Sequence, residues 1–165
     1  PDEGLNVYQY LTEKYGTKEA DRKLDLVKFA AYSQDLVLDL EHLKLLSNSN
    51  LAHQAILALD SILDQYALTQ AIFHARFAHG KDIAKQEVLK NIIEGIGLDG
   101  SKVLRSIQHK EISDKQVELS KYVQSLGTHA TPFYVVDGKV IDGETWDESF
   151  DTLVLQKILL EDSKH

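Results

Sequence analysis

The chain has 165 residues, of which 43% are hydrophobic and 27% charged, a balance that is ordinary for a globular protein with its own core. A net charge of −8 argues against nucleic acid as a partner, because phosphates require a basic face. Since no apolar run is long enough for a signal peptide or a membrane span, we expect a soluble, cytoplasmic protein without a membrane partner.

The N-terminal part of the chain predicts two helices. Residues 5–15 place apolar side chains on one face, and Gly16 would end this helix. Thr17 is expected to cap the next helix, because a threonine side chain can accept a hydrogen bond from a free backbone N–H group there. The apolar residues of this second helix that we expect to be buried are Leu24, Val27 and Ala31.

A loop is expected over residues 35–46, and a helix after it. Asn48 or Ser49 would cap this helix, since both residue types favour the N-cap position. Its apolar face consists of Ala52, Ala55, Ile56 and Leu59.

The following helix is predicted to extend to about His79, with Phe73 and Phe77 one turn apart. In a regular α-helix, His74 and His79 would lie about 140° apart around the axis. We therefore expect no metal site at these histidines, because two ligands of one metal ion must share a face.

Three more helices are expected before residue 127. The first spans residues 85–94 and ends at the glycines that follow it. The other two begin at residues that favour the N-cap, and the second of them ends at Gly127. The candidate caps are Asp99 or Ser101 for one helix and Ser113 or Asp114 for the other.

One β-hairpin is expected, over about residues 133–141. Its first four residues are apolar, which predicts a strand covered on both faces, and Asp137 with Gly138 favours a two-residue type I′ turn. The only other candidate strand is Val37–Leu45, which alternates poorly. A lone hairpin is marginal in water, so other residues of a longer protein or a second copy in a homodimer would have to complete the sheet. A capping box at Thr145–Glu148 predicts a final helix.

Several motifs occur in an order that resembles one protein family. Thr131 and Pro132 stand at the entrance of the hairpin, as in the thioredoxin-fold oxidoreductases of the DsbA family. The chain resembles most closely the FrnE-like branch, which is related to 2-hydroxychromene-2-carboxylate isomerases and kappa-class glutathione transferases. The other segments that carry this resemblance are Pro1–Gly4, Tyr10–Gly16, Asn48–His53 and Ile72–Ile83.

The resemblance implies an α/β, thioredoxin-like fold with a large helical insertion, of which this chain supplies a mostly α part and one hairpin. It divides the chain into a mainly helical region, residues 1–126, and a C-terminal thioredoxin-like element, residues 127–165. The second region would contain the proline loop, the hairpin and the final helix.

The same resemblance implies the candidate site. Ala130, Thr131 and Pro132 would form a loop with a cis peptide bond before the proline, whose backbone binds the substrate. Asn48 and His53 are expected at the mouth of the groove that faces this loop. Each also has a purely structural interpretation, because asparagine is a common helix cap and a histidine in a first turn is often half-buried. The sequence offers no catalytic residue and no metal ligand set.

Family oxidoreductases act through a Cys-x-x-Cys pair at the start of their first helix, whereas this chain contains no cysteine. The pair belongs to an N-terminal βαβ unit of about 30 residues or more, which we expect to be missing from this sequence. The resemblance therefore implies a parent protein disulfide oxidoreductase or isomerase that needs no cofactor and acts on a thiol or disulfide, including those of proteins. The chain itself would have no dithiol activity.

Two alternatives stay open. One is a glutathione-dependent isomerase or transferase, in which a serine replaces the cysteine and glutathione is a substrate. Gln54 weakens this interpretation, because glutathione-using relatives often carry an arginine at the corresponding position. The other is a redox-silent interaction module. This alternative takes the absence of cysteine at face value, because it requires no thiol.

Overall fold

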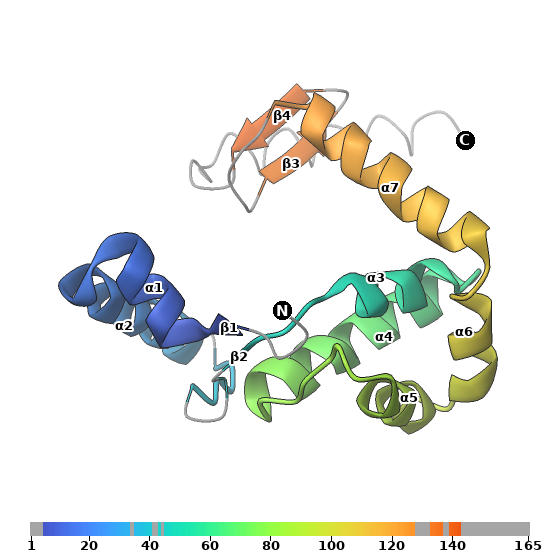
Figure 1. The fold of residues 1–165 in the computed structure, drawn as a ribbon, viewed down its shortest axis with the longest axis horizontal. Helices are drawn as coiled ribbons and strands as arrows, with labels where there is room; N and C mark the ends of the chain where they lie inside the picture. The colour runs from blue at the N-terminus through green and yellow to red at the C-terminus, as the bar shows by residue number, and fades with distance from the viewer. Residues whose placement is uncertain are drawn as a thin grey trace, which may run out of the picture. The chain divides into compact units, whose positions relative to one another are not determined.

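The computed structural model describes residues 5–33, 35–40, 43, 45–127, 133–136 and 139–142. These residues belong to two compact units, which comprise residues 1–116 and 117–165 and divide within one helix (Figure 1). The predicted Asp137-Gly138 turn and the predicted final helix lie outside the described residues. Within the described segments, no helix combines the length and the hydropathy that crossing a membrane requires.

The first unit begins with two helices, α1 (Val7–Tyr15) and α2 (Thr17–Ser33), which contact each other. Gly16 joins them at a φ of 82°, a left-handed conformation that costs glycine little. The predicted start of α1 was wrong by two residues, because Asn6 caps this helix by accepting a hydrogen bond from the Gln9 N–H at 2.9 Å. Thr17 is the first residue of α2 instead of its cap.

Residues 5 and 6 form a short strand, β1 (Leu5–Asn6), that pairs with β2 (Leu45–Leu46) in antiparallel register. The sequence predicted neither of these strands at these positions. Among the described residues of the candidate segment Val37–Leu45, only the last belongs to a strand. Two-residue strands have no alternation to detect, which explains the difference.

Four helices and one wide turn follow in the first unit, before the helix in which the two units divide. They are α3 (Asn50–Leu57), α4 (Ile62–Phe73), the π-helical turn η1 (His74–Ala78), α5 (Gln86–Gly95) and α6 (Gly100–Ser106). Contacts run from α3 to α4, from α4 to α5, from α5 to α6 and from α6 back to α3, so these helices enclose one core.

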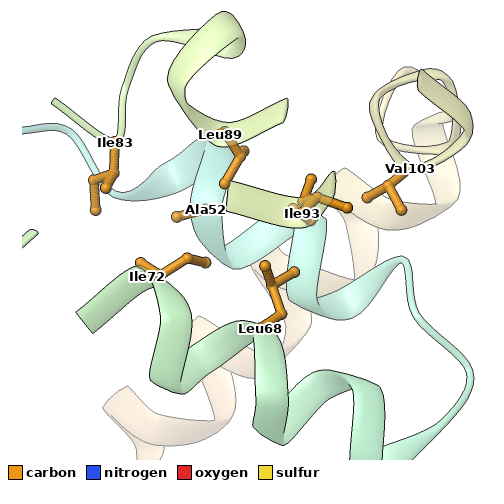
Figure 2. Close-up of a cluster of buried hydrophobic side chains, with 8 residues drawn as sticks. Ala52, Leu68, Ile72, Ile83, Leu89, Ile93 and Val103 are labelled. Carbon is orange, nitrogen blue, oxygen red and sulfur yellow. The ribbon is translucent and has the colours of Figure 1, made fainter. Parts of the chain in front are cut away.

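The core contains fully buried apolar side chains from the facing helices (Figure 2). Leu89 and Ile93 of α5 lie opposite Leu68 of α4, and all three have no exposed surface. Burying side chains of this size contributes about 1.5–3 kcal/mol each to folding, so this cluster is the main stabilising element of the first unit. The other buried members are Ala52, Ala55, Ile72, Ile83 and Val103.

Helix α6 begins at the cap that the sequence predicted. The Asp99 carboxylate accepts a hydrogen bond from the Lys102 N–H at 2.8 Å. We expect Asp99→Ala to lower the free energy of unfolding by about 0.5–2 kcal/mol, because this N–H group loses its partner. Urea denaturation followed by circular dichroism measures the loss.

Asp60→Ala is the matched control for the cap, because Asp60 is an exposed aspartate outside every described helix. It should change the unfolding midpoint little. Equal losses in the two variants would show that the Asp99 cap contributes nothing specific.

Helix α7 (Lys110–Ser125) begins before the predicted caps. Ser113 lies inside the helix and donates a hydrogen bond from its hydroxyl to the Lys110 carbonyl at 2.8 Å. Asp114 forms an ion pair with the Lys110 ammonium at 2.7 Å. Both side chains therefore interact within the start of the helix, and the predicted cap was wrong by four or five residues, since His109 precedes the helix. Gly127 follows the helix at a φ of 70°, in agreement with the predicted helix end.

The predicted hairpin is confirmed in the second unit. Strands β3 (Phe133–Val136) and β4 (Lys139–Asp142) pair in antiparallel register, with Val135 opposite Val140. These two valines are 39% and 41% exposed, so the chain itself leaves them partly uncovered, and the expected cover on both faces of β3 stays a prediction.

Candidate functional site

Asn48 lies just before α3 and acts on the backbone of its first residue. Its side-chain oxygen accepts a hydrogen bond from the Asn50 N–H at 2.9 Å. Ser49 occupies the N-cap position, but its side chain forms no capping hydrogen bond. This contact supports a structural role for Asn48, because its side chain satisfies a free N–H group at the start of the helix.

His53 lies on the first turn of α3 with its side chain exposed, whereas the neighbouring Ala52 is buried. Its backbone N–H donates to the Ser49 carbonyl at 3.0 Å and so fixes the turn. The imidazole is not enclosed in the core, so a ligand can reach it.

A hydrogen bond connects the start of α3 to α7. The Gln116 side-chain amide donates to the side-chain oxygen of Asn50 at 3.5 Å, across 66 residues of sequence. The sequence pattern gave no signal for this contact, because neither residue belongs to a periodic apolar face. Both residues belong to the first unit.

Ala130, Thr131 and Pro132 lie outside the described residues, and only the hairpin that follows them is described. Their substrate-binding role and their position relative to Asn48 and His53 stay predictions. The described part of the first unit nevertheless contains hollows that the sequence did not predict, and two of them lie beside η1.

The larger hollow is a groove of about 700 Å³ between α2 and the end of α4. Phe73 of α4 and Phe77 of η1 line it with stacked rings, whose centroids are 5.6 Å apart. These rings are 53% and 39% exposed, and Val27 on the α2 side is 50% exposed. The expected burial of Val27 was wrong, because it faces this groove. The arrangement can accept apolar side chains or rings.

The groove is held together by backbone contacts from the segment that follows α2. The Asp39 N–H donates to the Phe77 carbonyl at 2.8 Å, which ties residues 35–40 to η1. Asp35 adopts a φ of 53°, and aspartate tolerates this left-handed conformation better than most residues. The polar residues that line the groove are Asp35, Gln70 and His74.

Arg76 is a charged residue of η1, and the apolar periodicity of the sequence did not indicate that it would be buried. It is only 7% exposed, and its guanidinium donates to the Lys81 carbonyl at 3.5 Å. Burial lowers the pKa of Arg76, and the nearby Asp82 carboxylate opposes this effect. Arg76 therefore connects the wide turn to the loop that follows it.

The comparison with known proteins agrees with the fold. A model of the family described as "DSBA-like thioredoxin domain" matches residues 12–155. A search of curated proteins gives no match. The matched region contains every described helix from α2 to α7 and the β3–β4 hairpin. Since the match covers well over half of the sequence, the chain belongs to the family of DSBA-like thioredoxin domains, which is of the thiol–disulfide oxidoreductase type.

Proposed function

We propose that this chain is the helical and substrate-binding part of a FrnE-like thiol–disulfide oxidoreductase. The observation that carries the proposal is the family match, which includes both the helical region and the hairpin that follows Pro132. The order of the motifs Asn48–His53 and Ile72–Ile83 supports the FrnE-like branch.

In this proposal the chain binds the substrate and supplies no electrons. Disulfide exchange requires a thiolate that attacks one substrate sulfur, forms a mixed disulfide and releases the other sulfur as a thiolate. The 165 residues contain no cysteine, so the attacking thiolate has to come from other residues of the parent protein. Thr131 and Pro132 would hold the substrate backbone beside it.

The apolar groove between α2 and η1 supports a protein substrate. Unfolded chains that exchange disulfides expose apolar side chains, and the half-exposed rings of Phe73 and Phe77 can contact them. His53 is exposed in the same unit, and an imidazole can accept a thiol proton near neutral pH.

The redox-silent interaction module is a second candidate, because the lack of cysteine favours it directly. It differs from the first candidate in one measurable property, the thiol content of the natural gene product. The glutathione-dependent isomerase has less support, since Gln54 provides no charge for an anionic tripeptide.

The test compares the 165-residue chain with the product of the natural gene in an insulin-reduction assay. We expect no activity from the chain alone, because none of its side chains can replace a thiolate. We expect activity from the gene product, together with an intact mass above 18.6 kDa and titratable thiols. Pro132→Ala should slow the gene product several-fold, since the proline fixes the loop backbone that binds substrate.

Lys102→Gln, an exposed change on α6, is the control and should leave the rate unchanged. A gene product of 18.6 kDa without thiols would contradict the oxidoreductase proposal and favour the interaction module. A Pro132→Ala rate equal to that of the wild type would remove the substrate-binding role of the loop.

A further inference from the structure

A second cavity, of about 410 Å³, lies between η1 and α5. Its titratable lining residues are all basic: His74, His79 and Lys81. This composition is unusual for the chain, which has 26 acidic residues against 18 lysines and arginines. The remaining lining is apolar except for the side-chain amide of Asn91.

The π-helical turn brings the two histidines together. Their ring centroids are 4.8 Å apart, and the ring planes meet at 81°. A π-helix closes its hydrogen bonds between residues five apart, so residues at this spacing come to the same side. The expected separation of about 140° was therefore wrong, because it assumed regular α-helix geometry through His79.

Two histidines alone do not make a metal site, since catalytic zinc is held by three protein ligands and structural zinc by four. In the part of the chain that the structure describes, no group of three or more histidine or carboxylate side chains could hold a metal ion. The cavity lining instead combines hydrogen-bond donors with apolar side chains.

The charge of Lys81 is available to a ligand. The nearest acidic neighbour in sequence, Asp82, interacts with Arg76 and lies 4.0 Å from the Lys85 ammonium. Among the described residues, Lys81 forms no ion pair, and its side chain is exposed at the edge of the cavity. An anion can approach it without displacing an existing partner.

We propose that this cavity binds a small organic carboxylate with an apolar body. The carboxylate would accept hydrogen bonds from the Lys81 ammonium and from the imidazole N–H groups of His74 and His79. The apolar body would contact Val88 and Ile92 of α5, which line the cavity. A volume of about 410 Å³ is near the lower end for ligand pockets, which fits a ligand of about one ring.

The test titrates the 165-residue chain with sodium benzoate at constant ionic strength and follows the histidine side chains by NMR. We expect benzoate to shift the signals of His74 and His79, and we expect the neutral isostere benzamide to leave them unchanged. Lys81→Gln should weaken benzoate binding by up to about fivefold, the upper end of the range for one exposed charge pair. Lys81→Gln combined with His79→Gln should weaken it further.

Lys102→Gln removes an exposed lysine away from the cavity and should leave binding unchanged. The proposal is wrong if benzoate shifts neither histidine, or if benzamide shifts both equally. An equal loss of affinity in Lys102→Gln and Lys81→Gln would also overturn it, because overall charge would then explain the binding. All variants should keep the wild-type circular dichroism. Since no redox assay is used, the outcome is independent of the proposed oxidoreductase function.

Discussion

Leu89→Ala should lower the free energy of unfolding by about 2–5 kcal/mol. Leu89 has no exposed surface and lies in the cluster that α3, α4, α5 and α6 enclose. Truncation removes apolar contacts and leaves a cavity, because the surrounding helices can relax only in part. Urea denaturation followed by circular dichroism at 222 nm measures the change as a lower midpoint with an unchanged slope.

Leu63→Ala is the matched control, since Leu63 is also a helical leucine but is 76% exposed. Its effect should be within about 0.5 kcal/mol of zero. If the two variants lost the same stability, the helices of the first unit would not pack around Leu89 as described.

Gly100→Ala should lower the free energy of unfolding by about 1–3 kcal/mol, through overpacking instead of a cavity. A Cβ atom at Gly100 would lie 2.9 Å from the Lys90 carbonyl oxygen and 2.8 Å from its Cγ. The carbonyl belongs to the backbone of α5 and cannot move alone, so α5 and α6 would have to separate. The same urea titration measures this loss.

Gly95→Ala, at the end of the neighbouring helix α5, provides the opposite expectation. No atom lies within 4 Å of a Cβ at this position, and its backbone conformation suits any residue. The substitution should raise the free energy of unfolding by about 0.4–1 kcal/mol, because alanine restricts the unfolded chain. Similar losses from both glycine changes would rule out close packing at Gly100 as the cause.

The hairpin could be predicted from sequence because its determinants are local. An apolar run of four residues and an Asp-Gly pair specify two strands and their turn without reference to the rest of the chain. The β3–β4 register confirms the two strands, whereas the turn lies outside the described residues. The cap at Asp99 was predictable for the same reason, since its partner is three residues away.

The start of α7 shows where local rules fail. Serine and aspartate favour the N-cap, yet Ser113 and Asp114 both interact with Lys110 inside the helix. An Asp four residues after a Lys can stabilise a helix from its surface as well as from its end. Sequence preference alone does not distinguish these two positions.

The hollows beside η1 were not predictable from periodicity. Each depends on which helices lie side by side, and the groove also depends on the Asp39–Phe77 backbone contact. Of the candidate site residues, Asn48 and His53 were predictable as the start of α3. The substrate role of the loop at Pro132 rests on family resemblance and stays a prediction.

The π turn η1 determines on which side of the helix axis the side chains at its end lie. One residue removed from His74–Ala78 would let an α-helix continue through this turn. His79 would then lie four residues after His74, a spacing at which α-helical side chains are neighbours, so the two rings would stay close but would change their edge-to-face geometry. Since His74 lines both hollows, a one-residue change in length would alter both surfaces at once, whereas most point substitutions would alter only one of them.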